Sequence, residues 1–104
     1  LSDNLVANSI ATVSDLLIEN NMISISAEES QVKGGALLTT GHTYYELGKQ
    51  TAQMAKKILV DGIAPADIPV EKPQVLQLTV NKTTADKLGV DITTDFYKDA
   101  IIVE

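Results

Sequence analysis

The stretch Ala36–Leu59, ALLTTGHTYYELGKQTAQMAKKIL, decides the fold. It opens as a short apolar run, turns after Gly41, and continues as an amphipathic helix. Small and apolar residues recur there at the spacing of one helix face: Leu47, Gly48, Thr51, Ala52, Ala55, Ile58 and Leu59. Thr43 and Glu46 have the spacing of a capping box, and Gly62 is expected to stop the helix. In an α/β protein, the turn of such a strand–turn–helix joint lines the ligand crevice.

The segment before this joint reads as one helix followed by one strand. Apolar periodicity predicts a helix over Leu5–Asn20, which any of the three preceding polar residues can cap. Asn20 and Asn21 are a natural helix end because Asn tolerates the left-handed conformation. Met22–Ala27, MISISA, is rich in β-formers and is predicted to be a strand.

The remaining elements complete an α/β pattern. We expect a loop over Glu28–Gly35, a strand over Ala36–Thr40, an extended connector over Val60–Pro73, a strand over Val75–Asn81, short helices over Asn81–Gly89 and Thr94–Ala100, and a strand or tail over Ile101–Val103. This order predicts a parallel, Rossmann-like sheet with helices on its faces. A right-handed βαβ unit also needs a strand ahead of Ser2, so we expect a fragment.

Composition narrows the class of partner. The formal charge of −6 and the lack of a basic stripe argue against nucleic acid and against an anionic membrane surface. The absence of cysteine excludes thiol catalysis, disulfides and cysteine-ligated metal within these 104 residues. A single histidine cannot make a metal site alone, and we expect neither a metal nor a cofactor. No apolar run approaches the length of a membrane span.

Ser2, Asp3 and Asn4 are the first candidate site. In a doubly wound sheet, residues at a helix N-terminus line the crevice at the carboxyl ends of the strands. This turn offers a hydroxyl, a carboxylate and an amide, which suit a ligand with an ammonium group. Helix capping explains the same residues without any ligand.

The turn Gly41, His42, Thr43 and Tyr44 is the second candidate site. Tyr44 and the adjacent Tyr45 can offer an aromatic wall and a phenol to a cleft. A solvent-facing His42, a helix-capping Thr43 and tyrosines that pack on the protein explain the same positions. Both interpretations remain open on the sequence.

Catalysis has no supporting pattern. Glu28 and Glu29 are paired carboxylates after a predicted strand, but adjacent acids in a polar loop are usually solvated. Gly34-Gly35 matches no phosphate-binding motif. We therefore expect no enzyme and no catalytic residue.

GALLTTGHTYYELGKQTAQMAKKIL and PADIPVEKPQVLQLTVNKTTADKLGV together resemble the C-terminal third of a receptor family. This is the tryptophan/tyrosine-type family of amino-acid receptors of ABC importers, with a type I periplasmic-binding-protein fold. The Ser2-Asp3-Asn4 start resembles the family's TDN-like turn. Thr43 departs from the family motif G-x-D-Y-Y-E-L-G, in which an acidic residue commonly stands at its position.

The resemblance implies a fold, a site and a location. Residues 1–35 would belong to the second lobe, 36–62 to the hinge strand and helix of the first lobe, and 63–104 to a connector, a returning strand and C-terminal helices. Asp3 and Asn4 would contact the α-amino end of an amino acid in the cleft between lobes. The partners would be this solute and ABC permease subunits. The protein would be extracytoplasmic, either periplasmic or anchored by a lipid on an upstream cysteine.

One alternative from another class remains. The chain can be a self-contained α/β interaction or regulatory domain that binds no small molecule. An enzyme is the more distant third interpretation.

Overall fold

The computed structural model describes residues 3–104, which divide into two compact units. Unit 1 comprises residues 3–41 together with Gln77–Glu104, and unit 2 comprises His42–Leu76. Unit 1 is therefore built from two separate parts of the chain, and unit 2 is the segment between them. The chain passes from one unit to the other twice, at Gly41/His42 and at Leu76/Gln77.

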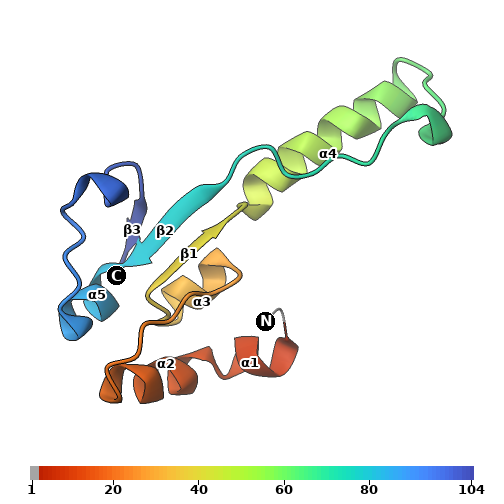
Figure 1. Ribbon diagram of the computed structural model, residues 1–104. Helices are drawn as coiled ribbons and strands as arrows, with labels where there is room; N and C mark the ends of the chain where they lie inside the picture. Colours follow the sequence, from red (N-terminus) through yellow and green to blue (C-terminus); the bar gives the residue numbers. More distant parts are fainter. Residues whose placement is uncertain (1–2) are drawn as a thin grey trace. The chain divides into compact units, whose positions relative to one another are not determined.

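A three-stranded mixed sheet organises unit 1 (Figure 1). Its order is β1 (Leu38–Gly41), β2 (Gln77–Asn81) and β3 (Ile101–Val103). β2 and β3 are parallel, as expected, but β1 and β2 are antiparallel, with Leu38 opposite Val80. The expectation of a purely parallel sheet is therefore wrong for β1 and β2. Parallel neighbours require a crossover connection, and the segment between β1 and β2 does not make one.

The predicted strand Met22–Ala27 reduces to a single parallel bridge between Ile25 and Leu38. The Ser26 N–H donates to the Leu38 carbonyl, and the Leu38 N–H donates to the Ser24 carbonyl. The Leu37 N–H instead donates to the Ser24 hydroxyl oxygen, at 2.8 Å. Serine side chains that bond to neighbouring backbone compete with a regular ladder, and this explains why the strand is so short.

The helices within residues 3–41 differ from the sequence expectation in two places. The predicted Leu5–Asn20 helix is split into α1 (Asn4–Asn8) and α2 (Ile10–Glu19) at Ser9, a residue type that favours caps over helix interiors. The predicted loop Glu28–Gly35 contains a short helix, α3 (Glu29–Lys33), which packs against β1 and β2. α5 (Lys82–Leu88) is confirmed, with Asn81 as its N-cap and a left-handed Gly89 as its C-cap.

The core of unit 1 lies where the sheet meets α5. Leu37, Val80 and Ala85 are buried, and half-buried side chains pack around them, namely Leu38, Leu78, Leu88, Val90, Ile92, Tyr97 and Ala100. The predicted helix over Thr94–Ala100 shrinks to one 3-10 turn, η2 (Asp95–Tyr97). β2 also begins two residues later than expected, at Gln77.

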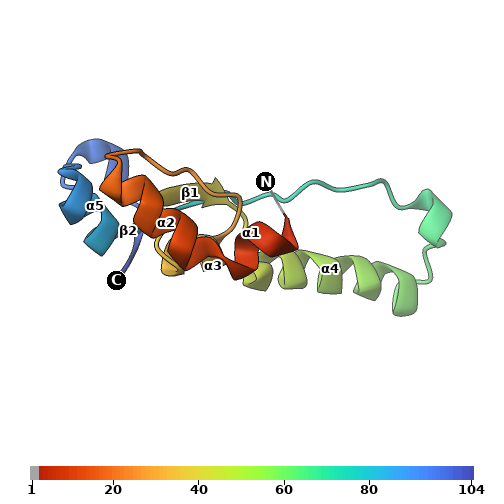
Figure 2. The same ribbon diagram turned by 90° about the horizontal axis from the view of Figure 1, so that it is seen from below.

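Unit 2 consists of one helix and the connector that returns beside it. The predicted long helix is confirmed as α4 (Tyr44–Leu59), and residues 60–76 run back beside it, as both views show (Figures 1 and 2). α4 ends before Gly62, whose φ of +71° belongs to the turn in which the Ile63 N–H donates to the Lys57 carbonyl. The connector is extended except for one 3-10 turn, η1 (Pro65–Asp67), which begins at a proline.

Candidate functional site

The candidate residues of the sequence fall into two groups, one in each unit. Ser2 lies outside the described residues. Asp3, Asn4 and Gly41 belong to unit 1, and His42, Thr43 and Tyr44 open unit 2. Each group is built by the end of a local element.

Asp3 is the N-cap of α1. Its Oδ1 accepts from the Leu5 N–H at 2.8 Å and from the Val6 N–H at 3.2 Å. Only one carboxylate oxygen is used in this cap, because both bonds go to Oδ1. The side chains of Asp3 and Asn4 are exposed. A residue in this position can therefore cap the helix and still present its Oδ2 to a cation.

Gly41 closes β1 in an ordinary backbone conformation. A Cβ built on it would stand 3.4 Å from the Ala27 carbonyl oxygen, which is normal van der Waals contact. Glycine is thus not required here by the packing of unit 1. The turn that follows begins at His42, which is exposed.

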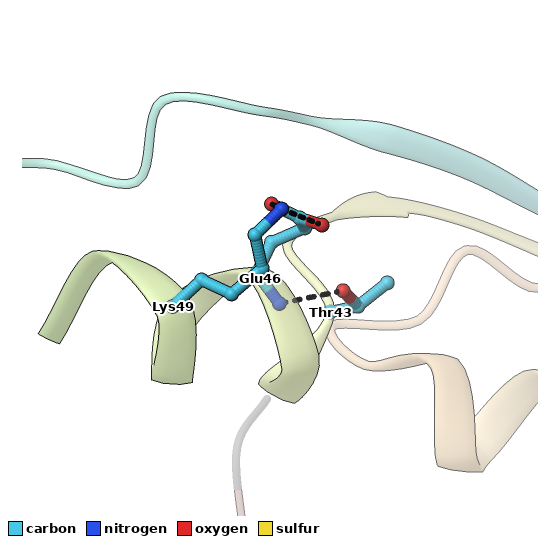
Figure 3. A network of polar contacts seen from close by, with 3 residues as sticks. All are labelled: Thr43, Glu46 and Lys49. Atoms are coloured by element: carbon cyan, nitrogen blue, oxygen red, sulfur yellow. Dashed lines mark hydrogen bonds and ion pairs between the residues drawn. The ribbon is translucent and has the colours of Figure 1, made fainter. Parts of the chain in front are cut away.

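Thr43 caps α4, as the sequence predicts (Figure 3). Its hydroxyl oxygen accepts from the Glu46 N–H at 3.2 Å. The Glu46 carboxylate lies 3.2 Å from the Lys49 Nζ, so its charge is matched within the first turn of the helix. Lys49 Nζ also lies 5.5 Å from the centre of the Tyr45 ring, a cation–π distance. Tyr44 and Tyr45 are both 73% exposed.

A groove of about 260 Å³ lies within unit 2, between α4 and the returning connector. Among the candidate residues that the structure describes, His42 alone lines it. The other lining residues are mostly polar: Glu46, Leu47, Lys49, Gln50, Gln53, Glu71, Pro73, Gln74 and Val75. No pattern in the sequence predicts this groove.

Glu71 holds the connector against the helix beside this groove. Its carboxylate accepts from Gln50 Nε2 at 3.0 Å and pairs with Lys57 Nζ at 3.1 Å. Gln50 also donates to the Lys72 carbonyl at 3.0 Å. The bond from Gln50, together with the bond and charge of Lys57, lowers the pKa of Glu71 below its ordinary value of 4.5. The sequence contains one signal for this contact, because Gln50 and Lys57 lie two turns apart on one face of the helix.

Within residues 3–104, no group of three or more His, Asp or Glu side chains is placed to hold a metal ion. In the same range, no helix has the length and apolar character needed to cross a membrane. The polar groups of both candidate turns suit hydrogen bonding to a small polar ligand.

Comparison with known proteins decides the family. The family model described as ABC transporter substrate binding protein matches residues 1–103. The chain belongs to the ABC transporter substrate-binding protein family. It is also 33% identical over 89 residues to the Tyrosine-binding protein of Clostridioides difficile, a match that covers 86% of this chain and 26% of the relative.

Solved structures of substrate-binding proteins share the fold. A ligand-free, open substrate-binding protein with adhesive properties from Clostridium difficile matches with a TM-score of 0.78 and 32% identity, over 99% of this chain and 34% of that one. An ABC domain in complex with L-Trp from Streptococcus pneumonia matches with a TM-score of 0.77 and 26% identity, over 98% of this chain and 35% of that one. The chain thus spans about a quarter to a third of the length of these family members.

Proposed function

We propose that this chain forms part of an extracytoplasmic solute receptor of an ABC importer. The receptor binds an aromatic or hydrophobic amino acid and carries out no catalysis. Family membership over residues 1–103 is the observation that carries this proposal. The relative called Tyrosine-binding protein and the similar structure in complex with L-Trp support an amino acid as the solute. The same family assignment disfavours a self-contained domain without a small-molecule ligand.

The proposal assigns the chain to two lobes that close on the solute by hinge motion. Residues 1–35 contribute to the second lobe, 36–62 provide the hinge strand and the helix of the first lobe, and 63–104 provide the connector, returning strand and C-terminal helices. The chain passes between the two compact units at Gly41/His42, which falls within the proposed hinge segment 36–62, and at Leu76/Gln77, which falls within the segment 63–104. A hinge requires short crossings of this kind.

Asp3 and Asn4 are proposed to hold the ammonium end of the amino acid. The exposed position of Asp3 and its Oδ2, which takes no part in the cap, support this role. Ser2, Gly41, His42, Thr43 and Tyr44 are proposed as further ligand contacts. Thr43 offers no negative charge, so Asp3 is the proposed counter-ion of the ammonium group.

Location and partners follow from the same proposal. A receptor of this kind acts outside the cytoplasm, in the periplasm or on a lipid anchor, and delivers its solute to ABC permease subunits. Residues 3–104 contain no helix suited to crossing a membrane.

A thermal-shift screen of the complete protein tests the function. The panel contains L-Trp, L-Tyr, L-Phe and L-Leu, with L-Glu, a hexose and a nucleoside as members of other solute classes. A ligand present at 100 times its Kd should stabilise the protein by about 2.7 kcal/mol. We expect this for an aromatic or hydrophobic amino acid, with calorimetry to confirm binding. Stabilisation by the hexose or nucleoside alone, or by nothing on the panel, contradicts the proposal.

Asp3→Asn tests the site separately from the fold. Asparagine caps a helix as well as aspartate does, so α1 should be preserved while the negative charge is lost. We expect affinity for the amino acid to fall about tenfold or more and the melting temperature of the ligand-free protein to stay the same. Asp15→Asn is the matched control because it removes an exposed carboxylate from α2. Equal affinities of the two variants would remove Asp3 from the site.

A further inference from the structure

The turn that follows α4 contains the single Asp-Gly pair of the chain, Asp61 and Gly62. Both residues are exposed and lie where the connector begins its return beside the helix (Figure 1). Among aspartates, one that is followed by glycine is the most prone to rearrange to isoaspartate, because glycine has no side chain to shield its backbone nitrogen. The turn therefore carries a reactive sequence at an accessible position.

The surroundings of Gly62 leave its backbone nitrogen open to reaction. The N–H groups of Asp61 and Ile63 donate to carbonyls of α4, whereas the Gly62 N–H donates to no acceptor within residues 3–104. Gly62 has a φ of +71°, and a Cβ built on it would meet no atom within 4 Å. An exposed backbone group without a hydrogen bond moves more easily than one that is held. The nitrogen can therefore approach the side chain that precedes it.

The Asp61 carboxylate is held in place by an ion pair with Lys56. The Lys56 Nζ lies 3.1 Å from its Oδ1 and 3.2 Å from its Oδ2. Both side chains are exposed, to 64% for Lys56 and 42% for Asp61, so the pair is weak. Closing a ring onto the Gly62 nitrogen requires the carboxyl group to leave this pair. Lys56 is therefore a restraint that slows the reaction without preventing it.

We infer that Asp61 isomerises to isoaspartate in the native protein and that Lys56 slows this reaction. The Gly62 nitrogen attacks the Cγ of the protonated Asp61 carboxyl group, and the amide proton leaves with the carboxyl hydroxyl as one water molecule. The resulting succinimide then takes up one water molecule. Hydrolysis at the former side-chain carbonyl restores aspartate, and hydrolysis at the main-chain carbonyl gives isoaspartate, which adds one carbon to the backbone of the turn. The inference does not depend on the identity of the solute.

Incubation of the complete protein at neutral pH and physiological temperature tests the site. Isoaspartate is detected by enzymatic methylation, and tandem mass spectrometry locates it within each peptide. Asp67 is the internal control, because it is exposed in the same connector while the following Ile68 N–H donates to the Pro65 carbonyl at 3.3 Å. We expect isoaspartate to accumulate at Asp61 about tenfold faster than at Asp67, or more. Equal rates at the two positions, or no isoaspartate at Asp61, would overturn the inference.

Variants test the chemistry and the restraint separately. Asp61→Glu keeps the charge, but its longer side chain closes the corresponding ring far more slowly, so the signal at this position should disappear. Lys56→Gln should raise the rate about two- to fivefold, whereas Lys56→Arg, which retains the pair, should leave it unchanged. Lys49→Gln is the matched control, because it removes another exposed lysine of α4, one that pairs with Glu46. Equal rates in the Lys56→Gln and Lys49→Gln variants would contradict the role of Lys56, and a signal that survives Asp61→Glu would contradict the site.

Discussion

The side-chain amide of Asn81 donates to the backbone carbonyl of Val32, 2.9 Å away and 49 positions earlier in the chain. Its Oδ1 accepts from the Thr84 N–H at 2.9 Å, and the Thr84 hydroxyl donates to the Gly35 carbonyl at 2.8 Å. Asn81 and Thr84 are both buried. A single asparagine thus caps α5 and ties the end of β2 to the end of α3.

Asn81→Ala should be among the most damaging single substitutions in unit 1. It removes a helix cap and one of the two donors to the Val32 carbonyl, which keeps only the Gly35 N–H at 3.1 Å. The two losses together cost about 1–3 kcal/mol. Chemical unfolding of the complete protein measures the loss. Asn8→Ala, at an exposed position of α1, is the control and should stay within about 0.5 kcal/mol of the wild type. Similar values for the two variants would contradict the role assigned to Asn81.

Two serine substitutions should change the stability of the protein in opposite directions. Within residues 3–104, the buried Ser14 hydroxyl has no hydrogen-bond partner, so Ser14→Ala should raise stability by about 0.5–1.5 kcal/mol. Ser24→Ala removes the acceptor of the Leu37 N–H and should lower stability by about 1–2 kcal/mol. Urea unfolding curves of the two variants, compared at equal slope, check both values. A destabilising Ser14→Ala would show that the hydroxyl has a partner elsewhere in the complete protein.

Gly35 is constrained twice, by its backbone and by its neighbour. Its φ is +114°, and a Cβ there would lie 3.0 Å from the Ser14 Cβ. Gly35→Ala should therefore cost more than Gly89→Ala, because Gly89 has a φ of +67° and open space around it. We expect about 1–2 kcal/mol for Gly89→Ala and a larger loss for Gly35→Ala, measured by thermal unfolding. The reverse order would exclude crowding at Ser14 as the cause.

The contact between the connector and α4 should weaken in acid. The bonds from Gln50 and Lys57 favour the ionised Glu71 carboxylate, so its pKa in the folded protein lies below the ordinary 4.5. The stabilisation is complete above the unfolded-state pKa and is lost as the pH falls through the folded-state pKa. The protection factors of the amides in residues 68–74, which correct for the intrinsic pH dependence of hydrogen exchange, should therefore fall as the pH drops below 4.5. In the Glu71→Gln variant, the same amides should exchange faster already at neutral pH. Their protection should then show no further loss in acid.

Thr43→Asp tests whether the first turn of α4 faces the ligand. Aspartate caps a helix at least as well as threonine, so the melting temperature of the ligand-free protein should not fall. The added carboxylate should tighten binding of an amino acid about tenfold if its ammonium group lies within reach. Thr43→Asn is the control, with the same shape and no charge. Equal affinities of the Asp and Asn variants, measured by calorimetry, would place the ammonium group elsewhere.

The sequence predicted those elements whose signals are local. α4 follows from its apolar periodicity, and the Thr43 cap and the Asn81–Gly89 helix follow from capping residues at the right spacing. The strand Gln77–Asn81 follows from alternation. These features depend on contacts within a few residues, so a single sequence contains the information.

The missed features depend on partners far away in the chain. The antiparallel pairing of β1 with β2 joins residues about forty positions apart, and no local pattern records that choice. Glu28–Gly35 looked like a loop because α3 is only one turn long and is held by packing against the sheet. At the candidate site, the role of Thr43 as a cap was predicted, and Asp3 was one of three residues expected to be able to cap the first helix. The bonds of Glu71 to Gln50 and Lys57 were not predicted.

The separation of β1 and β2 along the sequence sets the order of events during synthesis. β1 leaves the ribosome some forty residues before the strand that pairs with it, and β3 follows another twenty residues later. The edge of β1 that pairs with β2 therefore remains unpaired and prone to association while α4 and the connector are synthesised. A nascent chain stalled before Gln77 should bind chaperones or associate with its neighbours, and one that has released Val103 should not.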